Sequence, residues 1–105
     1  MNNRTFAPRC ATTGIHNALP QSMKLQLFEY IDQQVLSGIE MDYLQTFELT
    51  AKVIDGKPVQ YIVHQQEVPE RRQDHIINGI DAPLNLTVWI VDGDSHAIML
   101  LPEEY

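Results

Sequence analysis

Apolar residues recur at helical spacing between residues 20 and 38. Within "PQSMKLQLFEYIDQQVLSG" apolar side chains stand at four-residue steps, with mostly polar residues between them: Met23, Leu27, Ile31 and Val35. Proline is tolerated in the first turn of a helix, and Gly38 suits the left-handed position after the last turn. The pattern predicts one amphipathic helix here, with Asn17 or Ser22 as its N-cap.

After this helix the pattern changes to the two-residue alternation of a β-strand. In "FELTAKV", residues 47–53, apolar and polar side chains alternate, which is typical of a strand with one buried face and one hydrated face. Asp55 and Gly56 readily adopt the positive φ angles of a tight two-residue turn, and "VQYIVHQQ" follows them. These features predict a β-hairpin from about Leu44 to Glu67.

Four further segments favour short strands because they are rich in β-branched or aromatic residues and are bounded by turn residues. They are "CATTGI" (10–15), "RQDHIING" (72–79), "LTVWIV" (86–91) and "HAIMLL" (96–101). The expected order is β-α-β-β-β-β-β, with antiparallel local connections. A helix followed by successive strands predicts one α+β domain over residues 1–105, in which one helix packs on a mainly antiparallel sheet of five to six strands.

Composition agrees with a single folded domain. The chain has 105 residues, of which 44% are hydrophobic and 20% charged. The opening "MNNRTFAPRC" lacks the apolar core of a signal peptide, and no apolar run approaches the ~20 residues of a membrane span. The lone cysteine, Cys10, has no disulfide partner, and lone intracellular cysteines are usually packed or inert. We expect a cytoplasmic protein with no membrane partner.

Acidic residues outnumber basic ones by fourteen to seven, which gives a formal charge of -7. Nucleic-acid binding relies on basic side chains that displace counterions, so this balance argues against a nucleic-acid partner. It suits a basic protein surface instead. The candidate protein-binding residues are the acids of a predicted turn and of the C-terminus, together with the last tyrosine: Glu67, Glu70, Glu103, Glu104 and Tyr105.

The segment "VHQQEVPERRQDHI" combines two histidines with several carboxylates, as a metal or acid-base site does. A metal site needs ligands that converge at about 2 Å. On a strand His64 and Glu67 would point to opposite faces, and His75 follows only after Pro69 and a turn. We interpret the segment as a hydrated turn between neighbouring strands, with both histidines at the surface or half-buried and no cofactor. The alternative is a metal-binding protein or metal-assisted hydrolase that uses His64 and His75.

Three other patterns have structural explanations. Residues 92–94 have the acidic spacing of a calcium loop, but Ala97 stands where that loop needs glycine, so a hairpin turn is expected. Ser95 and His96 are consecutive, which prevents the geometry of a catalytic triad. Trp89 lies in an apolar strand and is expected in the core. None of these patterns predicts an enzyme.

Four phrases in combination carry a resemblance: "LQLFEYID", "MDYLQTFEL", "IVHQQEVPE" and "MLLPEEY". They resemble a family of small uncharacterised proteins of Gram-positive bacteria and their phages, the domain of unknown function nine hundred and sixty. The resemblance covers about residues 15–105. It implies a compact cytosolic protein in a phage or mobile-element context, and it supplies no activity, cofactor or catalytic residue.

These observations together favour a non-enzymatic accessory module that binds another protein through an acidic surface and an exposed sheet edge. The same edge would serve self-association, so a homodimer is an alternative assembly. An acidic mimic of nucleic acid is a third hypothesis, which requires carboxylates arrayed along one face.

Overall fold

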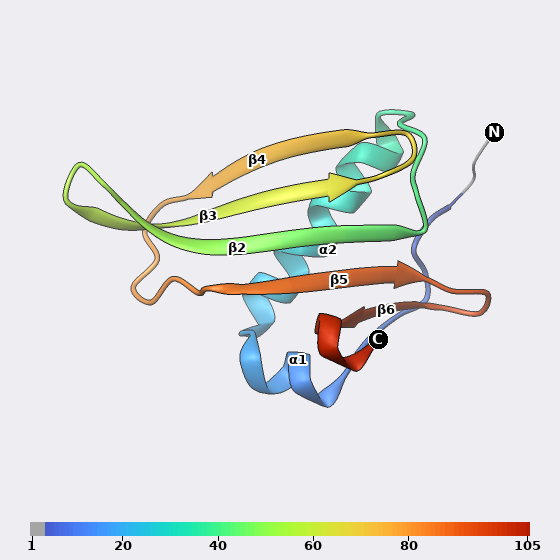
Figure 1. Ribbon diagram of the computed structural model, residues 1–105, viewed down its shortest axis with the longest axis horizontal. Coiled ribbons are helices and arrows are strands. Elements are labelled where there is room, and N and C mark those ends of the chain that lie inside the picture. The colour runs from blue at the N-terminus through green and yellow to red at the C-terminus, as the bar shows by residue number, and fades with distance from the viewer. Residues whose placement is uncertain (1–3) are drawn as a thin grey trace.

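The computed structural model describes residues 4–105, in which the α-helices lie on one face of a six-stranded sheet (Figure 1). The elements are β1 (Arg9–Ala11), α1 (Thr13–Ala18), α2 (Gln21–Leu36), β2 (Leu44–Ile54), β3 (Lys57–Gln66), β4 (Arg71–Ile77), β5 (Leu86–Asp92), β6 (Ala97–Leu100) and η1 (Pro102–Glu104). The fold is α+β, as predicted. Residues 1–3, the start of the segment "MNNRTFAPRC", lie outside the described residues.

The strand order is β1-β6-β5-β2-β3-β4. All neighbours are antiparallel except β1 and β6, which run parallel with Arg9 beside Ala97. The sheet is thus mainly antiparallel, as predicted, with β1 and β6 as the parallel pair. Parallel neighbours need a long connection, and almost the whole chain, from α1 to β5, separates these two strands.

The segment "CATTGI" forms a strand only at its start, because residues 13–15 begin α1. The hydroxyl of Thr12 accepts a hydrogen bond of 3.2 Å from the backbone N–H of Ile15, which is the geometry of an N-cap. Ile15 is fully buried by this turn. Threonine is common both in strands and at helix N-caps. Here Thr12 is the N-cap of α1, because the helical turn buries Ile15.

The predicted helix is α2, and Gly38 after it has a φ of 78°, in the left-handed region. Its N-cap is Pro20, which corrects the expectation of Asn17 or Ser22. Asn17 is already part of α1, and Ser22 is part of α2, so neither stands at the junction. No helix among the described residues is long and apolar enough to cross a membrane.

The core lies between α2 and the sheet. From α2 it takes the following buried side chains: Met23, Leu27, Phe28, Tyr30 and Ile31. From the central strands it takes alternate residues such as Phe47 and Leu49 of β2 and Val88 and Ile90 of β5. Phe6 is also fully buried, although no periodic pattern surrounds it. Each such side chain stabilises the fold by about 1.5–3 kcal/mol.

The predicted hairpin joins β2 to β3 through a two-residue turn. Ile54 pairs with Lys57, and Asp55 and Gly56 have φ angles of 52° and 75°. The opposite face of β2, β3 and β5 carries no helix and faces the viewer in Figure 1, with η1 beside it near the C-terminus. This uncovered face receives the side chains that alternate with the core positions.

Candidate functional site

His64 lies in the core, where it is only 2% exposed and stacks on Phe47 with ring centroids 4.2 Å apart. Its Nε2 is 2.7 Å from Oε1 of Gln45, and its Nδ1 is 3.4 Å from Nε2 of Gln34. Burial, together with the smaller effect of the nearby charges of His75 and Arg71, lowers the pKa of the imidazole to about 3. The expected surface or half-buried location is therefore wrong for His64, which is a neutral core residue.

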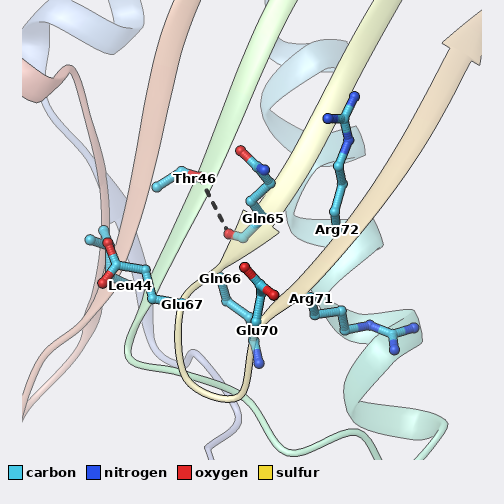
Figure 2. A pocket seen from close by; sticks show the side chains of 8 residues that line it. All are labelled: Leu44, Thr46, Gln65, Gln66, Glu67, Glu70, Arg71 and Arg72. Atoms are coloured by element: carbon cyan, nitrogen blue, oxygen red, sulfur yellow. Dashed lines mark hydrogen bonds between the residues drawn. The ribbon is translucent and has the colours of Figure 1, made fainter.

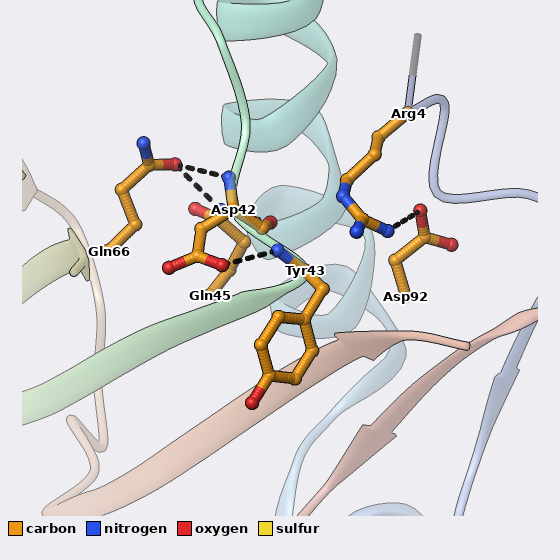
Figure 3. Close-up of polar contacts among 6 residues, drawn as sticks. All are labelled: Arg4, Asp42, Tyr43, Gln45, Gln66 and Asp92. Atoms are coloured by element: carbon orange, nitrogen blue, oxygen red, sulfur yellow. Dashed lines mark hydrogen bonds and ion pairs between the residues drawn. The ribbon is translucent and has the colours of Figure 1, made fainter. Parts of the chain in front are cut away.

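The amides next to His64 form a buried polar network (Figure 3). Nε2 of Gln45 donates to Oε1 of Gln66 at 2.8 Å, and the same oxygen accepts from the backbone N–H of Asp42 at 3.1 Å. Nε2 of Gln66 donates to the carbonyls of Glu40 and Pro69 at 3.0 and 2.9 Å. The network ties the loop before β2 to the turn after β3, and its role is structural.

His75 lies on β4, beside β3, with its ring stacked on that of Tyr30 at a centroid distance of 3.7 Å. Burial lowers the pKa of His75, an effect that the charge of Asp74 partly opposes. Within residues 4–105 no group of three or more histidine, cysteine or acidic side chains is placed to hold a metal ion. The two histidines thus make ring and amide contacts, and their geometry gives the metal alternative no support.

The turn between β3 and β4 is exposed, as expected for a hydrated connection. A pocket of about 550 Å³ opens beside it (Figure 2). The pocket is lined by the ends of β2 and β3, the turn and the start of β4: Leu44, Thr46, Gln65, Gln66, Glu67, Glu70, Arg71 and Arg72. Glu67 and Glu70 have no ion-pair partner in the described part of the chain. They are therefore available to a cationic partner.

Trp89 lies on the uncovered face of the sheet. It pairs with Thr46, so it faces away from the core that its neighbours Val88 and Ile90 enter. Its ring meets the edge of the Tyr105 ring at a centroid distance of 5.5 Å and an angle of 73°. The expectation of a core tryptophan is wrong, because strand alternation gives the buried positions to its two neighbours.

Tyr43 completes an aromatic group on this face. It is 44% exposed, and Tyr105 is 70% exposed. The pKa of the Tyr43 phenol is raised chiefly by Tyr105, and also by the nearby charges of Asp42 and Glu67. In Figure 3 its side chain points away from Asp42 and the buried amides. We define the acidic aromatic patch as Tyr43, Trp89, Tyr105 and the nearby Glu67, together with the exposed Glu70 of the same turn and the exposed Glu103 of η1.

The two C-terminal glutamates differ in their surroundings. Oε1 of Glu104 accepts hydrogen bonds from the hydroxyl of Thr12 at 2.6 Å and from the backbone N–H of Leu101 at 2.8 Å. These bonds lower the pKa of Glu104. Glu103 is exposed and has no ion-pair partner among the described residues. Glu104 thus fixes η1 against the start of α1, whereas Glu103 stays available for binding.

The hairpin turn expected at residues 92–94 joins β5 to β6, where Asp92 pairs with Ala97. Asp92 also forms an ion pair of 3.2 Å with Arg4 (Figure 3). Ser95 Oγ lies 2.8 Å from Nδ1 of His96, and in residues 4–105 no carboxylate bonds to that histidine. The pair therefore lacks the third member of a triad.

Cys10 is exposed on β1, so of the two usual states of a lone cysteine, packed or inert, it is not packed. It lines a pocket of about 370 Å³ together with His16. Nδ1 of His16 is 2.6 Å from Nζ of Lys24, so the imidazole contacts the lysine and makes no contact with the thiol. The cysteine lies on the short edge strand β1, and no further strand pairs with the outer side of β1.

A sequence family described as "Staphylococcal protein of unknown function (DUF960)" matches residues 8–104. The chain belongs to this family. The match confirms the resemblance carried by the four phrases and extends it to β1 and Cys10. Membership in the family brings no assigned activity.

A solved structure has the same fold: the crystal structure of a protein of unknown function from Enterococcus faecalis. The TM-score is 0.76 and the sequence identity 20%, and the alignment covers 100% of this chain and 96% of the other. No curated protein matches the sequence. The family and the fold are thus established, and the function must be argued from the surface of the chain itself.

Proposed function

We propose that this chain is a non-enzymatic binding module that holds a basic segment of another protein on the acidic aromatic patch. The observation that carries the proposal is the edge contact between Trp89 and Tyr105 on a sheet face that no helix covers. Tyr43 adds a second exposed phenol, and Glu67 brings a carboxylate close to it. Aromatic rings beside unpaired carboxylates form a surface suited to lysine and arginine side chains.

The chemistry of the patch explains this preference. A lysine or arginine over an aromatic face gains about 0.5–2 kcal/mol, depending on how far it is removed from water. Carboxylates such as Glu67 and Glu70 accept charge-assisted hydrogen bonds from the same cations. Tyrosine and tryptophan also supply rigid apolar area, which is why they are frequent anchors in protein interfaces. The formal charge of -7 draws a basic partner toward the surface.

Contacts of the titratable side chains favour a non-enzymatic role. His64 is held by Gln45, Glu104 by Thr12, and Asp74 by Arg72 at 2.8 Å. Each of these groups makes a contact that stabilises the fold, which is compatible with a structural role. We place the module in the cytoplasm, with a phage or host protein as its partner, in keeping with the resemblance described above.

Site-specific photo-crosslinking in cells tests this proposal. A photoreactive phenylalanine at Tyr105 probes the patch, and the same residue at Leu36, which is 87% exposed on α2, is the matched control. We expect one discrete crosslinked polypeptide from position 105 and none from position 36. Equal crosslinking at both positions would show that the patch has no special role.

Charge reversal adds a second control. The variant E67K/E70K should reduce crosslinking at position 105, whereas E29K/D81K, with the same change in net charge at exposed acids outside the patch, should leave it unchanged. High salt should also reduce it, because exposed ion pairs are screened. Crosslinking that resists E67K/E70K would contradict recognition by carboxylates.

A further inference from the structure

Strand β4 is an open edge of the sheet. It pairs only with β3 and is seven residues long, whereas β1 at the opposite edge has three. Figure 1 shows no element along the outer side of β4. Alternate backbone groups of an edge strand point away from the sheet and are free to pair with another strand. The length of β4 makes it the better template of the two edges.

Unpaired polar atoms lie on the side of β4 that faces α2. Oε1 of Gln34 and Nε2 of His75 are buried and have no hydrogen-bond partner within residues 4–105. The guanidinium of Arg71, on the same side of the same strand, has no hydrogen bond or ion pair there either. Buried polar groups are nearly always hydrogen-bonded, so the two buried atoms point to a missing partner at this edge, and the exposed guanidinium of Arg71 is a donor available there.

We propose that two copies of this chain associate through β4 and join their sheets into one continuous antiparallel sheet. The two-fold axis passes through Gln73, so that Gln73 of each copy lies opposite its equivalent. In this register Arg72 faces the partner's Asp74, and Arg71 faces the partner's His75. The inference concerns the sheet edge and stands independently of the function proposed for the acidic aromatic patch.

Charge complementarity selects this register. An axis through Asp74 would place the two Asp74 carboxylates opposite each other, and an axis through Arg72 would do the same with two guanidinium groups. Like charges at directly opposed positions destabilise strand pairing, whereas opposite charges stabilise it. With the axis at the uncharged Gln73, both arginine–aspartate pairs are formed on the uncovered face. Arg72 already contacts Asp74 within one chain, at 2.8 Å, so the dimer would assemble these charges into a four-member network.

The same register supplies donors to the unpaired atoms on the helix-facing side. Directly opposed residues have Cβ atoms ~4.5–5.5 Å apart, well within the reach of an arginine. The partner's Arg71 can therefore donate to Nε2 of His75 when the imidazole proton is on Nδ1. Oε1 of Gln73 accepts from Gln34 at 2.9 Å, which leaves the Gln73 amide nitrogen to donate to the partner's Gln34. A pocket of about 150 Å³ lined by Gln34, Arg71 and Gln73 gives these side chains room.

Sedimentation velocity of the untagged chain gives the first test. We expect a species with twice the 12.0 kDa mass of the chain, in equilibrium with monomer on dilution. A monomer at the highest soluble concentration would overturn the proposal. Circular dichroism of every variant confirms that it is folded.

Disulfide trapping tests the register. In a C10S background, Q73C should give a covalent dimer on mild oxidation, because opposed residues on the axis meet the Cα separation of a disulfide. The matched control is I76C, also exposed on β4, whose two copies would lie six residues apart along the paired strands. Crosslinking of I76C as efficient as that of Q73C, or none with Q73C, would overturn the register.

Charge variants separate the edge from the rest of the sheet. R72D places two pairs of aspartates opposite each other and should weaken dimerisation roughly tenfold or more. K52D carries the same charge change on β2, away from the edge, and should leave the dimer intact. Equal weakening by both variants would show that net charge, and no specific pairing at β4, controls association.

Discussion

Nε2 of His64 and Oε1 of Gln45 lie 2.7 Å apart beneath α2, in a contact that connects β3 to β2 within the core. Both side chains are almost fully buried, and the imidazole also stacks on Phe47. A histidine held in this way by an amide and an aromatic ring is neutral near pH 7. The contact therefore favours a structural role for His64 over a metal site.

Stability should depend on pH through His64. Burial lowers its folded pKa from 6.5 to about 3, so between these values the unfolded chain binds more protons than the folded chain. The stabilisation is complete above about pH 6.5 and is lost as the pH falls toward about 3. Between pH 7 and pH 5 the contribution of this residue should fall by about 2 kcal/mol. Urea unfolding at the two pH values measures it.

The variant H64Q isolates this effect, since glutamine keeps a polar partner for Gln45 and does not titrate. We expect H64Q to be less stable than the wild type at pH 7, with a flatter dependence of the unfolding free energy between pH 7 and pH 5. If both proteins lose the same free energy over this interval, His64 is not the buried titrating group.

Gln66 should be essential to the loop network, because its amide takes part in four hydrogen bonds. Q66A leaves the Gln45 amide and backbone groups without partners and should cost about 2–4 kcal/mol. Q65A, at the exposed neighbouring position, is the control and should change stability by less than ~0.5 kcal/mol. Chemical denaturation of both variants gives the comparison, and equal losses would contradict a specific role for the network.

The carboxylate of Glu104 leaves little room for a side chain at position 14. A Cβ placed at Gly14 would lie 2.6 Å from Oε2 of Glu104, closer than atoms can approach. G14A should therefore displace the flexible end of Glu104 from Thr12, with a small loss of stability. In an E104A background the clash is gone, and the same substitution within α1 should be neutral or stabilising by up to ~1 kcal/mol. A double-mutant cycle by thermal unfolding tests this reversal, which would be absent if helix propensity alone governed the site.

Removal of the Tyr105 side chain should affect binding far more than folding. Tyr105 is 70% exposed, so Y105A should change the unfolding free energy by less than ~0.5 kcal/mol. Trp89, the single tryptophan, loses its edge contact and should report the change through its fluorescence. Loss of partner binding with unchanged stability would agree with the proposed function. Unfolding of Y105A would instead give Tyr105 a structural role.

Local patterns predicted α2 and the hairpin well, and they failed where a residue's direction depended on distant strands. The period of Met23, Leu27 and Ile31 requires a helix wherever it packs. Asp55 and Gly56 require a tight turn through their own backbone preferences. Trp89 and His64 behaved otherwise, because the pairing of β5 and β3 with β2 determines which of two adjacent residues enters the core.

The acidic aromatic patch shows the same division between what local patterns predict and what tertiary contacts decide. The sequence indicated an acidic surface and named Glu67, Glu70, Glu103 and Tyr105, whose role as a binding surface remains a prediction. It did not indicate Tyr43 or Trp89, and it treated Glu104 as equivalent to Glu103. Only the folded chain brings η1 beside α1, where the hydroxyl of Thr12 donates a hydrogen bond to the Glu104 carboxylate.

The sequence by itself determined the α+β class, the main helix, the hairpin and the family, because these depend on periodicity, turn residues and local phrases. Tertiary structure alone decided that β1 runs parallel to β6, that His64 is buried and neutral, and that Trp89 meets Tyr105 on an uncovered face. The physical reason is that strand register and desolvation arise from contacts between residues far apart in the chain, which no local pattern specifies.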